Sequence, residues 1–326
     1  MNRQEQESGK TMTKEIQPVQ DARVREGDRK KALRGSLLLL LGSIIWGAAF
    51  AAQRAGMEHI GAFSFSGIRM LLGWAVLLPV AWFSEKKAGA ARVDPRRQRK
   101  AGLVCGLFLF IATSLQQQGL VYTSAGKAGF ITALYVVLVP VAGLILFHRN
   151  PGRAVWAGVA LAVTALFLLC TPAGGFQVEP GDLLLIGCAV CFTGQILAVD
   201  HYAPLVNGVA LARDEFLVTG VLSIAVALLT EPIRWSGIRE ALIPILYAGI
   251  MSSGVAYTLQ IIGQRDVNPT LASLIMCMES VFAVLTGAVL LGERLSPREL
   301  CGCGLMFAAV LLAQLAPWIH GRKPRR

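Results

Sequence analysis

Two short stretches decide how this chain folds: GSLLL at residues 35–39 and GDLLL at residues 181–185. The first lies in a long apolar run over residues 33–53, and the second opens another over residues 181–201. Each run leads into a further series of apolar segments. The pattern indicates one membrane unit that occurs twice in the chain.

The composition favours a membrane protein. Hydrophobic residues make up 54% of the chain and charged residues only 16%, well outside the range of a soluble domain. A helix needs roughly 20 apolar residues to cross the hydrocarbon core of a bilayer. The sequence predicts ten such spans and leaves no room for a soluble catalytic domain: 33–53, 63–83, 101–121, 127–147, 154–172, 182–203, 208–229, 241–263, 269–291 and 300–319.

Helix is the predicted form of every span. An unpaired backbone donor in lipid is costly, and these runs lack the alternation that is typical of barrel strands. We therefore expect an all-α integral membrane protein.

The ends of the chain are polar. The first 31 residues carry eight Lys or Arg and six Asp or Glu residues, which predicts a disordered cytoplasmic tail and no signal peptide. Residues 320–326 form a second, basic tail. With ten spans and an inner N-terminus, 23 of the 31 basic residues lie inside and six outside. The positive-inside rule then predicts that both termini are cytoplasmic and that the chain lies in the plasma membrane.

The net charge of +11 does not indicate nucleic acid as a partner, because the basic residues lie beside the membrane spans and not on a separable domain. The lipid bilayer and a small-molecule substrate are the expected partners.

Cysteine and histidine raise the question of metal or redox chemistry. Cys188 and Cys191 form one short pair and Cys301 and Cys303 another, but neither has a second ligand pair nearby. Within an apolar helix cysteine is a small packing residue. All four histidines fall at helix ends or in loops. We therefore predict neither a metal site nor a cofactor.

The duplication has a consequence for topology. At an offset of 145 residues Trp46 aligns with Cys191 and Arg69 with Asp214, a match that is weak in identity but sustained in pattern. If each half has five spans, an odd number, the second half enters the membrane from the opposite side. The prediction is two inverted five-helix repeats, a scaffold that can open to either face, over residues 32–173 and 181–319.

Several motifs, in order over the ten predicted spans, resemble the EamA-type transporters of the drug/metabolite transporter superfamily. They are Trp46-Gly47, FSGIR at 65–69, TSAGKAGFI at 123–131, Pro140, NPTLA at 268–272, Glu279 and LGERL at 291–295. The resemblance implies a ten-helix inverted-repeat carrier, commonly an exporter of amino acids or other small metabolites. Such carriers are driven by an ion gradient or by the gradient of the solute itself.

The eighth predicted span carries a polar stripe. Ser253, Tyr257, Gln260 and Gln264 follow one another at spacings that place them on one helix face. This face could line a cavity and hydrogen-bond a zwitterionic or amide-bearing solute. Hydrogen bonding between helices explains the stripe equally well.

Glu279 lies near the middle of the ninth predicted span. An acid at that depth costs on the order of 2.5–3.5 kcal/mol on insertion scales, and loss of water favours its protonated form. Glu279 could therefore exchange a proton for substrate. A purely structural, hydrogen-bonded acid is the alternative.

Arg69 lies about two turns into the second predicted span. It could anchor a substrate carboxylate through its planar donor fork, or it could snorkel to the interface and serve packing.

The third predicted span contains three consecutive glutamines, and Gln117 is the one that we expect in the cavity. Trp46, Tyr135 and Gln195 extend the expected lining, although ordinary packing accounts for the aromatic residues equally well. The predicted substrate-binding or coupling residues are thus Trp46, Arg69, Gln117, Tyr135, Gln195, Tyr257, Gln260 and Glu279.

The leading functional hypothesis is a secondary transporter, not an enzyme, that exports a small organic metabolite such as an amino acid or a drug-like solute. An integral-membrane enzyme acting on lipid is a second hypothesis, but the loops are nearly bare of clustered acids and histidines. A non-transporting membrane scaffold is a third. The chain has no P-loop, and the small-residue faces of the fifth and tenth predicted spans could support a homodimer.

Overall fold

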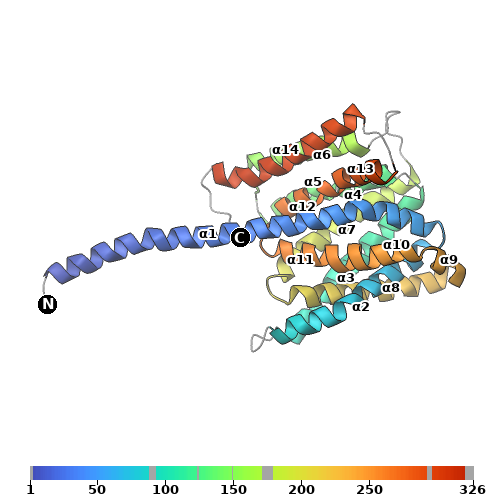
Figure 1. Ribbon diagram of the computed structural model, residues 1–326, viewed down its shortest axis with the longest axis horizontal. Helices are drawn as coiled ribbons and strands as arrows, with labels where there is room; N and C mark the ends of the chain where they lie inside the picture. The colour runs from blue at the N-terminus through green and yellow to red at the C-terminus, as the bar shows by residue number, and fades with distance from the viewer. Residues whose placement is uncertain are drawn as a thin grey trace.

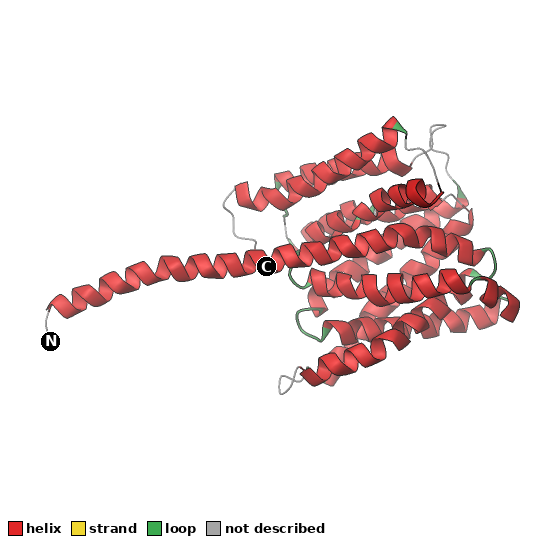
Figure 2. Cartoon of the chain, viewed as in Figure 1, coloured by secondary structure: helices red, strands yellow, loops and turns green. Residues whose placement is uncertain are grey.

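The computed structural model describes residues 3–87, 93–122, 125–148, 150–170, 179–291 and 296–319. Every regular element in these ranges is a helix (Figure 2). The expectation of an all-helical chain is confirmed. The helices are α1 (Arg3–Met57), α2 (Ala62–Lys87), α3 (Pro95–Tyr122), α4 (Ala125–Ala133), α5 (Tyr135–Phe147), α6 (Arg153–Cys170), α7 (Pro180–Tyr202), α8 (Gly208–Thr230), α9 (Trp235–Glu240), α10 (Leu242–Leu246), the π-helix η1 (Tyr247–Tyr257), α11 (Thr258–Gln264), α12 (Pro269–Met276), α13 (Met278–Leu291) and α14 (Pro297–Ile319).

Eight segments of the described chain are long and apolar enough to cross a membrane, so the protein is a multi-pass membrane protein. They are Arg29–Met57, Ala62–Lys86, Pro95–Tyr122, Ala128–Phe147, Pro180–Tyr202, Leu242–Gln264, Pro269–Thr286 and Pro297–Leu315.

The other two predicted spans, 154–172 and 208–229, also form helices but do not meet this standard. The apolar part of α6, Arg153–Leu169, is shorter. Helix α8 carries three consecutive ionisable residues, 213–215, in its second turn.

The N-terminal segment differs from the expectation of a disordered tail. Helix α1 begins at Arg3 and continues without a break into the first span, and its N-terminal part projects away from the other helices (Figure 1). The segment is rich in Gln, Glu, Lys and Arg, which are good helix formers. The charge of this segment did not predict its backbone conformation.

The spans pack as two groups, each built from both halves of the chain. In the first group, α1 and α2 from the first half pack against η1, α11, α12 and α13 from the second half. In the second group, α7 and α8 from the second half pack against α3, α4 and α5 from the first. The groups meet where α2 lies along α8 and where α5 contacts α12. Helices α6 and α14 lie side by side at one edge (Figure 1).

The two opening stretches make equivalent contacts across the molecule. A Cβ atom added to Gly35 would lie 2.8 Å from the backbone oxygen of Gly263, and one added to Gly181 would lie 2.7 Å from that of Gly119. Helices approach this closely only where both residues lack a side chain. Each repeat thus uses the glycine that opens its first span to contact the third span of the other repeat.

Reciprocal contacts recur at the edge pair. Gly158 of α6 approaches the backbone oxygen of Ala309, and Gly302 of α14 approaches that of Ala165. Gly158 and Ala165 of the first half thus correspond to Gly302 and Ala309 of the second half. The packing is therefore that of two repeats related by a pseudo-twofold axis.

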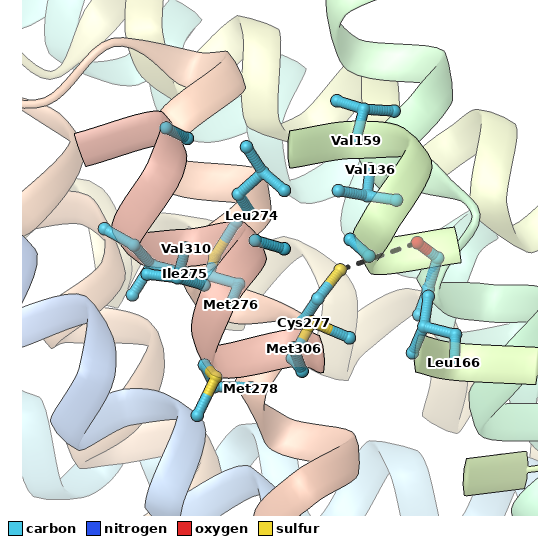
Figure 3. Packing of buried hydrophobic residues seen from close by; sticks show 14 of the residues in the cluster. Val136, Val159, Leu166, Leu274, Ile275, Met276, Cys277, Met278, Met306 and Val310 are labelled. Carbon is cyan, nitrogen blue, oxygen red and sulfur yellow. Dashed lines mark hydrogen bonds between the residues drawn. The ribbon is translucent and has the colours of Figure 1, made fainter. Parts of the chain in front are cut away.

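Two helices break where the groups meet. Leu134 separates α4 from α5, and Cys277 separates α12 from α13. The Cys277 thiol donates a hydrogen bond to the backbone oxygen of Ala133 at 3.6 Å, so the two breaks face each other within the apolar core (Figure 3). At the breaks, backbone hydrogen bonds of the 3₁₀ type join residues three apart instead of four. The Leu134 N–H, for example, donates to the Ile131 oxygen, so some of the backbone groups that leave the α-helical pattern are still hydrogen-bonded.

Candidate substrate-binding cavity

A cavity lies between the two groups of helices. Both repeats and both groups contribute to its wall, which is made of Trp46, Ala49, Phe50, Gln53, Arg69, Gln116, Thr132, Tyr135, Phe192, Gln195, Ile196, Ser252, Tyr257, Gln260, Met276 and Glu279.

Irregular helix geometry coincides with this wall. Thr132 and Tyr135 flank the break at Leu134, and Met276 and Glu279 flank the break at Cys277. Broken helices in the middle of a membrane protein free backbone and side chains to face a binding site.

The π-helix η1 places a different serine on the wall than α-helical spacing predicts. Its hydrogen bonds join residues five apart, and Ser252 and Tyr257, five apart, both line the cavity. The predicted Ser253 turns away, and its hydroxyl contacts the Met70 sulfur at 3.6 Å.

Arg69 is a buried cation on the wall. Its side chain is 2% exposed, and no described carboxylate forms an ion pair with it. Its Nε has no hydrogen-bond partner among the described residues. A guanidinium group taken out of water and left without an anion is costly. An anionic group in the cavity would supply the missing partner.

Glu279 lies on the same wall and is 7% exposed. The Tyr135 hydroxyl donates to its Oε1 at 3.4 Å, a long bond that joins the two broken helices. The contact ties the acid to the meeting point of the two groups.

Three glutamines and a second acid form a hydrogen-bonded chain beside the cavity. Gln195 donates from Nε2 to Oε1 of Glu215 at 2.9 Å. Gln260 donates to Oε1 of Gln195 at 3.0 Å and to Oε1 of Gln264 at 3.3 Å. All four side chains are buried, and Gln195 and Gln260 line the cavity.

Aromatic rings pack at the centre of this wall. The rings of Trp46 and Tyr257 meet edge to face, with centroids 4.8 Å apart, and Phe216 packs against the other side of Tyr257. The Trp46 indole donates to the backbone oxygen of Ser252 at 3.3 Å. These contacts hold both polar aromatic residues in fixed orientations.

The cavity brings together seven of the eight residues that the sequence singled out: Trp46, Arg69, Tyr135, Gln195, Tyr257, Gln260 and Glu279. The exception is Gln117, which is buried away from the cavity with its amide unpaired among the described residues, while its neighbour Gln116 lines the wall. One residue along a helix turns a side chain by about 100°, so three adjacent glutamines could not be told apart by spacing.

Glu215 is the residue that sequence reasoning missed. The contacting glycines align Gly35 with Gly181 at an offset of 146 and Gly119 with Gly263 at an offset of 144. The offset of 146 at the start of the repeats places Arg69 at the position of Glu215. The sequence alignment at 145 had selected Asp214 instead. Asp214 lies against α3, where it pairs with Arg213 at 2.8 Å and accepts from Gln98.

Carboxylates connect the two groups at both ends of the α2–α8 contact. At one end Glu231, the C-cap residue that follows α8, accepts backbone N–H bonds from Phe63 and Ser64 at 2.8 Å each. At the other end Glu85 of α2 pairs with Arg213 at 3.2 Å. Glu85 and Glu231 are 146 residues apart, so they occupy equivalent positions.

Family comparison agrees with this two-repeat architecture. The sequence profile of the EamA-like transporter family matches residues 33–171 and again residues 179–315. The chain belongs to the EamA-like transporter family. It is therefore a membrane transporter by family, as its motifs predicted.

This EamA-like chain is similar to named transporters over most of its length and most of theirs. It is 28% identical to an uncharacterized transporter of Archaeoglobus fulgidus over 287 residues, with 87% of each chain covered. It is 29% identical to the threonine/homoserine exporter RhtA of Escherichia coli strain K12, with 84% of this chain and 88% of RhtA covered. A crystal structure of 20% sequence identity shares the fold with a TM-score of 0.74, covering 88% of this chain and 99% of the other.

Proposed function

We propose that this EamA-like transporter is a secondary exporter of a small zwitterionic metabolite, with amino acids as the leading class. The observation that carries the proposal is Arg69, a buried cation with no ion-pair partner among the described residues, on the wall of a cavity that also offers the amide of Gln260 and the acid Glu279. A solute carboxylate fits the guanidinium fork, and a solute ammonium fits the acceptor oxygens of Gln260 and Glu279 in the same cavity.

The transport mechanism follows from where the cavity lies. It lies between two groups of helices that contact each other chiefly along α2–α8, with smaller contacts between α5 and α12, α8 and α11, and α2 and α3. Rocking of one group against the other would open the cavity to one face of the membrane and then to the other. The pseudo-twofold packing supports this mechanism, because related contacts close each face.

The proposal includes a full topology. We take α6 and α8 as spans in addition to the eight apolar segments, which makes ten spans in two inverted repeats with both termini in the cytoplasm. The early charges of α8 then lie at the inner face, where Arg213 pairs with Glu85.

Glu279 is the proposed coupling acid. It is the only carboxylate among the described cavity-lining residues, and it lies beside Tyr135, where the two broken helices meet. Binding a proton here and releasing it on the other side would link solute export to the proton gradient. The outward direction is supported by the likeness to RhtA, which is named as an exporter.

The test is flux in proteoliposomes that contain the purified protein. Labelled threonine is compared with 1-amino-2-propanol, its decarboxylated counterpart, with and without an imposed proton gradient. We expect threonine to exchange across the membrane, the amine without a carboxylate to do so at least about tenfold more slowly, and the gradient to accelerate net threonine flux. Equal flux of both compounds would contradict the role of Arg69, and flux of neither would contradict the proposed substrate class.

A further inference from the structure

Glu215 touches no solute, because it does not line the cavity, yet it lies at the end of the amide chain that does. Its side chain is completely buried between helices. A buried acid needs a reason to be retained, since an apolar residue would pack there at lower cost.

Hydrogen-bond direction supplies that reason. An amide group presents donors on its nitrogen and an acceptor on its oxygen, and nothing in its shape decides which way it points. A carboxylate oxygen accepts. Gln195 therefore turns its Nε2 toward Glu215 and its Oε1 toward Gln260.

The same reasoning determines which atoms of Gln260, on the cavity wall, are already hydrogen-bonded. Gln260 turns its nitrogen toward the oxygen of Gln195, and the second hydrogen of that nitrogen goes to Gln264. Both donors of Gln260 are thus used within the protein. Its Oε1 is left without a partner among the described residues.

We infer that Glu215 is a positioning residue that makes Gln260 a hydrogen-bond acceptor only, so that the cavity selects solutes with a donor, such as an ammonium group, at this point. The inference rests on the proposed function, because it concerns the second pole of the same solute. Arg69 would orient the anionic pole of the solute. Glu215, acting through Gln195 and Gln260, would orient the cationic pole.

The experiment compares two inhibitors of labelled threonine counterflow in proteoliposomes. 2-Aminobutanoate and 2-oxobutanoate share their carboxylate and carbon chain, but the first carries an ammonium group at C2 and the second a carbonyl. For the wild-type protein we expect 2-aminobutanoate to inhibit at a concentration at least about tenfold lower, because the carbonyl leaves the Gln260 oxygen unpaired.

Glu215→Gln keeps the shape of the side chain. It no longer fixes the direction of the hydrogen bonds, because a glutamine here can donate as well as accept. We expect the preference for 2-aminobutanoate to fall to about threefold or less, because 2-oxobutanoate should inhibit this variant at a lower concentration than it inhibits the wild-type protein. Asp214→Asn, the neutralised neighbour that faces Arg213, is the matched control and should keep the wild-type ratio.

A second variant keeps the test decisive if Glu215→Gln does not fold. Gln195→Met has nearly the same shape and removes the link between Glu215 and Gln260, so it should lower the ratio in the same way. An unchanged ratio in a folded variant overturns the inference and leaves the proposed function standing. Absence of threonine counterflow in the wild-type protein overturns the proposed function itself, and the ammonium-selecting role of Glu215 with it.

Discussion

Helices α2 and α8 occupy equivalent places in the two repeats, yet they bring opposite charges to the centre of the molecule. At the offset of 146 that relates Gly35 to Gly181, α2 carries Arg69 where α8 carries Glu215. Both side chains are buried, and they do not pair with each other among the described ion pairs. Packing is therefore repeated between the halves, whereas the chemistry is not. In the proposed mechanism, the repeated packing would let the scaffold open to both faces, and the unlike charges would give the bound solute one orientation.

The ends of the same two helices extend the comparison. Glu231 and Glu85 are equivalent, and each connects the two groups of helices at one end. Glu231 accepts two N–H bonds from the first turn of α2, where the helix dipole favours a negative charge. Glu85 is 44% exposed and pairs with a single arginine side chain. The two connections are thus equivalent in position but unequal in strength.

The largest expected effect comes from removing the acid that has no counterpart in the first repeat. We expect Glu279→Gln to reduce the gradient-driven component of threonine flux at least about tenfold, because the amide cannot carry a proton. Counterflow without a gradient should remain. The measurement is threonine flux in proteoliposomes with and without an imposed proton gradient. Full gradient stimulation in this variant would show that Glu279 is structural, and Asp214→Asn serves as the control.

Substituting the opening glycines tests the repeated packing. Gly35→Ala and Gly181→Ala each place a Cβ atom within 2.8 Å of a facing backbone oxygen, so we expect similar losses of about 1–3 kcal/mol in the free energy of unfolding. Gly304→Ala is the control, since a Cβ atom there meets nothing within 4 Å. The measurement is denaturant-induced unfolding in detergent micelles. A large loss for only one of the two glycines would break the equivalence of the repeats.

The smallest expected effect is the difference in the free energy of unfolding between variants of the two connecting carboxylates, Glu231 and Glu85. Glu231→Gln removes a charge that accepts two backbone bonds and one from the Ser64 hydroxyl, and we expect a loss of about 1–2 kcal/mol. Glu85→Gln weakens an exposed ion pair and should cost no more than about 1 kcal/mol. The same unfolding assay ranks the pair, and the reverse order would show that the Glu85 connection is the stronger one.

Long-range features of the fold were predictable because lipid imposes them. Runs of apolar residues must be helical in a bilayer, and the predicted spans agree with the observed helices within a few residues at most ends. Local irregularities were not predictable. The break at Leu134 falls between residues that are neither Gly nor Pro, and it depends on how α5 meets α12.

The site shows the same division at the level of single residues. Arg69 and Glu279 could be found because an isolated charge deep in an apolar run is costly in itself. Glu215 could not, because it follows Arg213 and Asp214 directly, and an alignment error of one residue selects the wrong acid. Ser252 was missed because the spacing of an α-helix was applied to a π-helix. Only the three-dimensional structure reveals both errors, because it shows the buried Glu215 bonded to Gln195 and the π-helix around Ser252.

The central claim is that Arg69 binds the anionic pole of a zwitterionic solute, and labelled threonine counterflow by Arg69→Leu and Arg69→Lys tests it most directly. The account predicts that Arg69→Leu lowers counterflow by at least about tenfold, and that Arg69→Lys, which keeps the charge but loses the bidentate fork, retains part of it. Flux of 1-amino-2-propanol should not fall in either variant. Wild-type threonine counterflow by a folded Arg69→Leu protein would contradict the account.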